Sequence, residues 1–352
     1  MKGEQQQDHV RSNEERPFKY NAGDRAIGVE MSQAASVASA AAEFIDEGER
    51  QKGMGPLNRA YFKRPGERPA FLVLRDGCED RPLFREDAGT APVGPCLIRS
   101  EEWLNTPELA ELYDSWLTSE DEVQTERTLQ RIYYRLRAAS LALLESADGA
   151  WTAVTLLYTP ELAALPARLA VLQDAQLEAL FSAVAESQRL GSDCRVDLLA
   201  PYPASAPEFA VMREFIEGVA EQTLGHAYAA ACRTGALIAP GAHYAAGEIA
   251  RIADFLVLDG AACGDAPEAS SAEGFARAAG EMLAAVRRVK PAAVVLAAGA
   301  PAAAALADLY AIGMSGIFCS AGQRTEALLR AACLTWMARQ DHHEDPAAGG
   351  WL

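Results

Sequence analysis

Short apolar runs alternate with longer amphipathic segments along most of the chain. The apolar runs are rich in β-branched and aliphatic residues with little polar alternation, which is typical of strands buried on both faces. The segments between them repeat apolar residues at helical spacing, as in residues 173–189 and 207–223. The predicted strands are residues 70–74, 94–98, 151–158, 194–201, 235–238, 255–258, 292–297 and 317–319.

This order of elements predicts a parallel sheet covered by helices. Seven or eight strands alternate with helices, and helical crossovers between parallel strands cover both faces of a sheet. A (β/α)8 TIM barrel fits best, with a doubly wound open sheet as the alternative. We expect a flexible polar arm over residues 1–28, a helical extension over 29–68, the barrel over 69–340 and a flexible tail over 341–352.

Two helical segments stand out from this alternation. Residues 107–144 are helical almost throughout, and the polar residues 118–121 in their middle predict a cap that joins two helices. Within the N-terminal extension, residues 30–49 predict a helix with small residues on one face.

Charge and cysteine content narrow the classes of function. The net charge of −17 argues against a nucleic acid or an anionic membrane surface as partner, because both require a dense basic face. The seven cysteines include no CxxC spacing, which favours reduced thiols and a cytoplasmic protein. No uncharged apolar run reaches the roughly 18 residues of a membrane span.

Four segments carry a resemblance to a known family. GPCLIRSEEWL at 94–104 is similar to a GIGLCRTEHMF-like strand, and WTAVTLLYTPELAALP at 151–166 is similar to PVTIRLLDPPLHEFLP. CRTGALIAPGAHYAAGEIARIADFLVL and IFCSAGQRTEALLRAACL match later segments in the same order. The chain thus resembles, over roughly residues 69–339, the C-terminal phosphoenolpyruvate-binding barrel of pyruvate phosphate dikinase, phosphoenolpyruvate synthase and enzyme I of the sugar phosphotransferase system.

The resemblance implies a substrate site and a class of ligand. Arg99 and Glu101 stand where the family has the arginine and glutamate of its RTE motif, and Arg168 matches the end of another family segment. The implied ligand is a small anion such as phosphoenolpyruvate or pyruvate, and the implied assembly is a homodimer. Arg99 could hold a carboxylate or phosphate bidentately, or it could form a structural pair with Glu101 or Glu102. His243 is a candidate acid or base, with a satisfied rim histidine as the alternative.

The chain departs from the family at the chemical positions. Thr155 replaces the substrate-clamping arginine of the third strand, and Tyr158 replaces the aspartate that follows it. Ala239 and Ala262 replace the two metal-binding carboxylates, and the segment VVLAAGAP has no catalytic cysteine. Mg2+ needs fixed oxygen ligands, which alanine does not supply. We therefore assign no catalytic residue.

A displaced metal site is the remaining possibility for Mg2+. Asp259 and Asp265 flank the position of Ala262, and Asp197 is a more distant third candidate. The alternative, which we prefer, is that Asp259 belongs to a turn that ends a strand and that Asp265 is a solvated loop residue. We therefore expect no metal site, and Mg2+ only if the protein is an active enzyme.

The sequence leads to two hypotheses of function, and it leaves open whether the protein is an enzyme. The first is a divergent barrel of the phosphoenolpyruvate-utilising type, without the usual phosphotransfer chemistry, that acts as a binding or regulatory protein. The alternative is an active phosphotransferase or lyase on phosphoenolpyruvate- or pyruvate-like keto acids. It would need phosphohistidine and ATP-grasp domains on separate chains, because residues 1–68 resemble neither.

Overall fold

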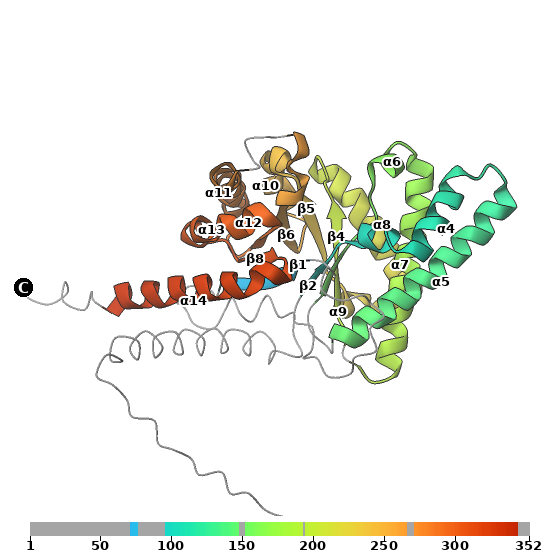
Figure 1. Cartoon of the computed structure of the whole chain (residues 1–352), viewed down its shortest axis with the longest axis horizontal. Helices are drawn as coiled ribbons and strands as arrows, with labels where there is room; N and C mark the ends of the chain where they lie inside the picture. The colour runs from blue at the N-terminus through green and yellow to red at the C-terminus, as the bar shows by residue number, and fades with distance from the viewer. Residues whose placement is uncertain (1–70, 77–95, 148–151, 193, 266–270, 344–352) are drawn as a thin grey trace, which may run out of the picture.

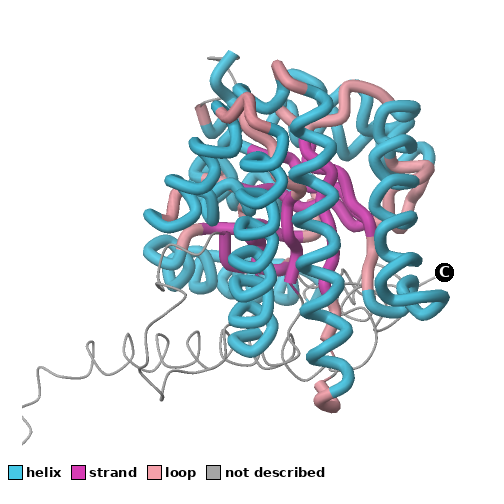
Figure 2. The backbone as a smooth tube through the Cα atoms, turned by 90° about the vertical axis from the view of Figure 1, so that its right-hand side faces the viewer, coloured by secondary structure: helices cyan, strands magenta, loops and turns pink. Residues whose placement is uncertain are grey.

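Eight parallel strands form a closed barrel in chain order, surrounded by helices (Figures 1 and 2). The computed structural model describes residues 71–76, 96–147, 152–192, 194–265 and 271–343. The closed barrel confirms the predicted (β/α)8 fold and excludes the doubly wound open sheet. The predicted arm and helical extension lie outside the described residues, as does the tail from residue 344 onward.

Each predicted strand is present, with bounds that differ by a few residues. The largest difference is in the third strand, which ends at Thr155 because the backbone of Leu157 bonds to the side chains of Gln173 and Gln176. The strands are β1 (Leu72–Asp76), β2 (Cys96–Ile98), β3 (Thr152–Thr155), β4 (Val196–Pro201), β5 (Thr234–Ile238), β6 (Phe255–Asp259), β7 (Val294–Ala298) and β8 (Gly316–Cys319).

In the described ranges, helices cover the outside of the barrel after each of the strands β2 to β8. The α-helices are α3 (Ser100–Leu104), α4 (Pro107–Thr118), α5 (Glu122–Ala147), α6 (Pro160–Ala163), α7 (Pro166–Arg189), α8 (Ala206–Leu224), α9 (Tyr228–Ala231), α10 (Ala246–Ile249), α11 (Ala272–Val289), α12 (Ala300–Ala304), α13 (Leu306–Ile312) and α14 (Ala321–His343). Three short 3-10 helices are η1 (Gly225–Ala227), η2 (Pro240–Ala245) and η3 (Gly260–Asp265). Since α14 extends to His343, residues 341–343 belong to the last helix and not to the tail in which we had placed them.

The α4–α5 hairpin is an addition between β2 and β3 that packs on α7 (Figure 1). The predicted break between its helices is confirmed, because the side chain of Asp121 accepts a hydrogen bond from the Val123 amide at 3.0 Å. Buried residues of the hairpin, including Trp116 and Leu136, share one core with α7 and α8. The hairpin therefore enlarges the core on one side of the barrel.

Side chains inside the barrel follow the alternation of the strands. In β6, Phe255 and Val257 belong to the apolar interior, whereas Leu256 and Leu258 pack against the outer helices. The next inward position of β6 is therefore Asp259. The same alternation makes Asp76 in β1, Arg99 after β2 and Thr155 in β3 the inward residues at the carboxyl ends of their strands. Polar side chains thus cap an apolar interior at one end of the barrel.

None of the helices in the described ranges is long and apolar enough to cross a membrane.

Gly316 sits where β8 closes the barrel against β1, and we predict that Gly316→Ala destabilises the fold. A Cβ atom at this position would lie 2.3 Å from the carbonyl oxygen of Leu72, so the two strands would have to move apart. Overpacking of this kind costs about 1–3 kcal/mol. Urea unfolding followed by circular dichroism measures the loss.

Gly280→Ala is the matched control, because a Cβ atom there meets nothing within 4 Å and the residue lies inside α11. Alanine favours a helix over glycine by about 1 kcal/mol, so this variant should equal or exceed the wild type in stability. Equal effects of the two substitutions would contradict the predicted crowding at the β1–β8 seam.

Candidate functional site

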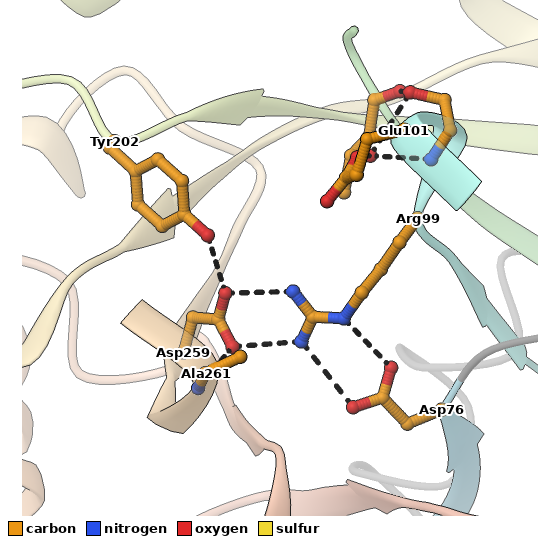
Figure 3. Close-up of polar contacts among 8 residues, drawn as sticks. Asp76, Arg99, Glu101, Tyr202, Asp259 and Ala261 are labelled. Atoms are coloured by element: carbon orange, nitrogen blue, oxygen red, sulfur yellow. Dashed lines mark hydrogen bonds and ion pairs between the residues drawn. The ribbon is translucent and has the colours of Figure 1, made fainter. Parts of the chain in front are cut away.

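A cluster of charged and phenolic side chains lies at the carboxyl ends of the strands, where (β/α)8 enzymes carry their active sites. It consists of Asp76, Arg99, Glu101, Tyr202 and Asp259, which we call the mouth cluster (Figure 3). Asp76 ends β1, Arg99 follows β2 and Asp259 ends β6, so three strands bring these groups together. The cluster is the candidate functional site.

Arg99 is the centre of the mouth cluster, and two carboxylates hold its guanidinium (Figure 3). Nη1 and Nη2 donate to the two carboxylate oxygens of Asp259, both at 2.8 Å. Nε and Nη2 donate to the two oxygens of Asp76 at 3.2 and 3.3 Å. Only 11% of the Arg99 side chain is exposed. The guanidinium is thus paired with two side chains of the protein itself. The sequence did not indicate that Asp76 and Asp259 would be these partners.

Asp259 accepts a full set of hydrogen bonds. Besides the two from Arg99, its Oδ2 accepts from the Tyr202 hydroxyl at 2.7 Å, and its Oδ1 accepts from the Ala261 amide at 3.0 Å. Burial favours a higher pKa for this carboxyl, but the hydrogen bonds and the charge of Arg99 outweigh it and lower the pKa of Asp259. Asp259 is therefore ionised at neutral pH.

This arrangement leaves no lone pair of Asp259 for a metal ion, since two carboxylate oxygens accept about four hydrogen bonds. The side chain of Asp265 lies outside the described residues. Asp197 pairs with Arg233 at the amino end of β4, six strand positions or roughly 20 Å from Asp259, so the two cannot share an ion. Among the residues that the structure describes, no group of three or more His, Cys, Asp or Glu side chains could hold a metal.

The preferred expectation placed Asp259 in a turn that ends a strand, and it did not include burial of the side chain. Asp259 does end β6, but its side chain is 0% exposed and belongs to the barrel interior. The reason is the alternation of β6, which turns this residue inward above Val257.

Tyr202 reaches the mouth cluster through an unusual backbone conformation. Its φ of +48° is the left-handed region, which costs a residue with a side chain about 1 kcal/mol or more. Leu199 points into the barrel, so Tyr202 would point outward if β4 continued. The left-handed turn instead directs the phenol to Asp259. Its ring also packs edge-to-face on Tyr158 at 5.9 Å. Burial and the neighbouring carboxylate of Asp259 raise the pKa of Tyr202, so it stays a neutral donor.

Glu101 lies beside the guanidinium and is held by Thr155. The Oγ1 of Thr155 donates to Oε2 of Glu101 at 3.1 Å and accepts from the Ser100 amide at 3.0 Å. Burial raises the pKa of Glu101, although its hydrogen bonds and the charge of Arg99 act in the opposite direction. Thr155 therefore presents a neutral hydroxyl to the mouth cluster, and this hydroxyl is already bonded to Glu101.

The other two sequence-predicted candidates do not bond to the mouth cluster. Arg168 donates to the carbonyls of Trp116, Leu117 and Ser119 at the end of α4, and its guanidinium lies 5.4 Å from the centre of the Trp116 ring. These bonds cap α4 and tie the added hairpin to α7. His243 bonds through Nδ1 to the Pro240 carbonyl at 2.6 Å and through Nε2 to Glu281 at 2.8 Å. Both are held by partners elsewhere in the fold.

The charge of the mouth cluster disfavours an anion. Three carboxylates face one guanidinium, which gives a formal charge of −2 when all are ionised and −1 when Glu101 is protonated. A phosphate or carboxylate ligand would have to displace Asp259 or Asp76 from Arg99. The arrangement can therefore hold the ends of β1, β2 and β6 together, but it does not present a free cationic clamp.

No protein-family model and no curated protein matches this chain. The resemblance to phosphoenolpyruvate-utilising barrels consequently rests on the four similar segments.

We predict that Asp259→Asn destabilises the protein in a pH-dependent way. The native pKa of Asp259 is below its unfolded value of about 3.9, so its stabilising contribution is complete above that value and is lost as the pH falls through the native pKa. At pH 7 the variant should lose roughly 3 kcal/mol, and the difference from wild type should shrink below about pH 4. Urea unfolding at several pH values measures it.

Tyr202→Phe is the control for this experiment, because it removes one hydrogen bond to Asp259 and keeps the ion pair with Arg99. It should cost about 1–3 kcal/mol and leave the acid dependence of the wild type in place. A difference between Asp259→Asn and wild type that is the same at every pH would show that the charge of Asp259 contributes nothing to stability.

Proposed function

We propose that this protein is a divergent barrel of the phosphoenolpyruvate-utilising type that lacks phosphotransfer chemistry and acts as a binding or regulatory protein. The observation that supports the proposal most strongly is the pairing of Arg99 with Asp259 and Asp76. Arg99 is the residue that matches the family's arginine, and in this protein two internal carboxylates accept hydrogen bonds from its guanidinium. A ligand anion would compete with both of them for the same N–H groups.

The cost of that competition is large compared with the binding free energy of a small anion. Removing one partner of a buried ion pair costs about 3–5 kcal/mol, because the other charge is left unpaired. Arg99 and Asp259 are 11% and 0% exposed, so this estimate applies to them. It lowers the affinity for an anion at Arg99 by roughly two to four orders of magnitude. We therefore expect no significant occupancy by phosphoenolpyruvate at cellular concentrations.

The positions of the missing chemistry support the same proposal. Phosphoryl transfer from phosphoenolpyruvate needs cationic groups at the developing charges and a divalent metal. Thr155 offers a hydroxyl that is already bonded to Glu101. Ala239 and Ala262 offer no ligand. The alternative of an active phosphotransferase or lyase would require a cation at Asp259 or Asp265, and Asp259 has no lone pair for it while Arg99 is in place.

The proposal also includes a cytoplasmic location and, by the resemblance, a homodimer. Free thiols support the first point, since Cys194, Cys232, Cys319 and Cys333 form no disulfide.

Isothermal titration with phosphoenolpyruvate, pyruvate and oxalate, each with and without Mg2+, tests the proposal. We predict that wild-type protein binds none of them more tightly than about 1 mM, and that Asp259→Asn binds an anion at least about tenfold more tightly because it frees part of the guanidinium. Asp197→Asn is the matched control: it also removes a buried carboxylate from an arginine, Arg233, but at the opposite end of the barrel.

The alternative function makes the opposite prediction. Mg2+-dependent turnover of phosphoenolpyruvate by the wild type, abolished in Arg99→Ala, would overturn the proposal. Equal anion affinities of Asp259→Asn and Asp197→Asn would show that the pairing of Arg99 is not what limits binding.

A further inference from the structure

The last helix, α14, carries apolar side chains on two opposite sides. On the inner side Ala327 and Ala331 are buried against the outer core of the barrel, with Leu328 and Leu334 packed beside them. The outer side presents four further residues at i, i+4, i+7 and i+8, a spacing that places them along one face of a helix. These residues, which we call the outer face of α14, are Leu329, Cys333, Trp336 and Met337.

The outer face is exposed in the described structure. The exposed fractions are 39% for Leu329, 58% for Trp336 and 54% for Met337, and Cys333 is also exposed. Figure 1 shows that the far end of α14 extends past α13. An apolar face of a helix is normally covered, and contiguous exposed apolar residues mark an interaction surface. The outer face of α14 therefore requires a partner.

We propose that the partner is residues 30–49 of the same chain, docked as a helix along the outer face of α14. The sequence predicts a helix here, and its apolar positions recur at intervals of three and four residues. One such series is Met31, Ala34, Ala38, Ala41 and Ile45. Four-residue ridges of mostly small side chains let two helix axes approach closely, which suits a partner with the bulky Trp336 and Met337.

Charge favours this pairing. Residues 30–49 contain five acidic residues and no Lys or Arg, whereas α14 contains three arginines against Glu326 and Asp341. Arg330 lies on the exposed side of α14, where it forms a solvent-exposed ion pair with Glu326 and keeps 56% of its side chain accessible. An acidic helix is therefore a better match for α14 than a second copy of α14, which would bring the arginines of both copies together.

The connection between the two segments is also favourable. Phe71, the first described residue, belongs to the same core cluster as Ala327 and Ala331, and β1 packs against α14. The chain therefore enters the barrel beside α14. The 22 residues from Glu49 to Phe71 span up to ~70 Å when extended, so the segment can reach the whole outer face.

Maleimide labelling of Cys333 in the full-length protein, with the modified peptide identified by mass spectrometry, tests the proposal. We expect slow labelling in the wild type and a rate about tenfold or more higher in Ala38→Asp, because a carboxylate buried against apolar side chains costs several kcal/mol. Ala40→Asp is the matched control. Ala40 lies on the opposite face of the predicted helix, so this variant should label as slowly as the wild type.

Two further measurements distinguish the other occupants. Trp336→Ser should speed tryptic cleavage after Arg50 and Lys52, next to the docked segment. The barrel of this variant should still melt above the temperature of the assay. Fast labelling of Cys333 in the wild type, or equal rates in Ala38→Asp and Ala40→Asp, would overturn the proposal. Slow labelling that accelerates on dilution would overturn it in favour of a second copy of the chain.

Discussion

The bidentate ion pair between Arg99 and Asp259 is the interaction on which the carboxyl end of this barrel depends. It joins the end of β2 to the end of β6 across the mouth, and Asp76 extends it to β1. Both charges are buried, so each requires the other: without Arg99 the mouth would hold two or three carboxylates with no countercharge. The hydroxyl of Tyr202 and the amide of Ala261 complete the shell of Asp259, and the left-handed backbone at Tyr202 is the structural cost of supplying one of those bonds.

This arrangement determines what the site can bind. An enzyme that clamps an anionic substrate keeps its cationic groups available and polarised toward the substrate. In this protein Arg99 already has a carboxylate partner, Asp259, with the bidentate geometry that a ligand carboxylate would adopt. Asp259 thus occupies the place of a ligand, and the same four bonds that hold it exclude it as a metal ligand. The same pairing therefore opposes both anion binding at Arg99 and metal binding at Asp259.

The fold could be predicted well from the sequence, because the strands of a parallel barrel are buried on both faces and therefore appear as short apolar runs. All eight runs became strands, and the cap at 118–121 became the break between α4 and α5. The same burial on both faces made the residues of the mouth cluster difficult to predict. Strands buried on both faces show no alternation in sequence, so inward residues such as Asp76 and Asp259 could not be told from outward ones.

Two parts of the site had no signal in the sequence. The pairing of Arg99 with Asp259 joins residues 160 positions apart, on strands that are not neighbours in the barrel. The left-handed conformation of Tyr202 follows from its surroundings, since tyrosine has no preference for it. Arg168 was expected at the site from a family motif, but the α4–α5 hairpin recruits it as a cap. The partners of Arg168 thus come from the α4–α5 hairpin, and nothing in the sequence connects the two.

The most direct test of this account is a crystal structure of the wild-type protein soaked with phosphoenolpyruvate and Mg2+ and inspected around Arg99. The account predicts that the Arg99–Asp259 bonds remain intact and that neither the anion nor the metal occupies the mouth. Phosphoenolpyruvate bound to the Arg99 guanidinium, with Asp259 turned away or coordinating Mg2+, would contradict it.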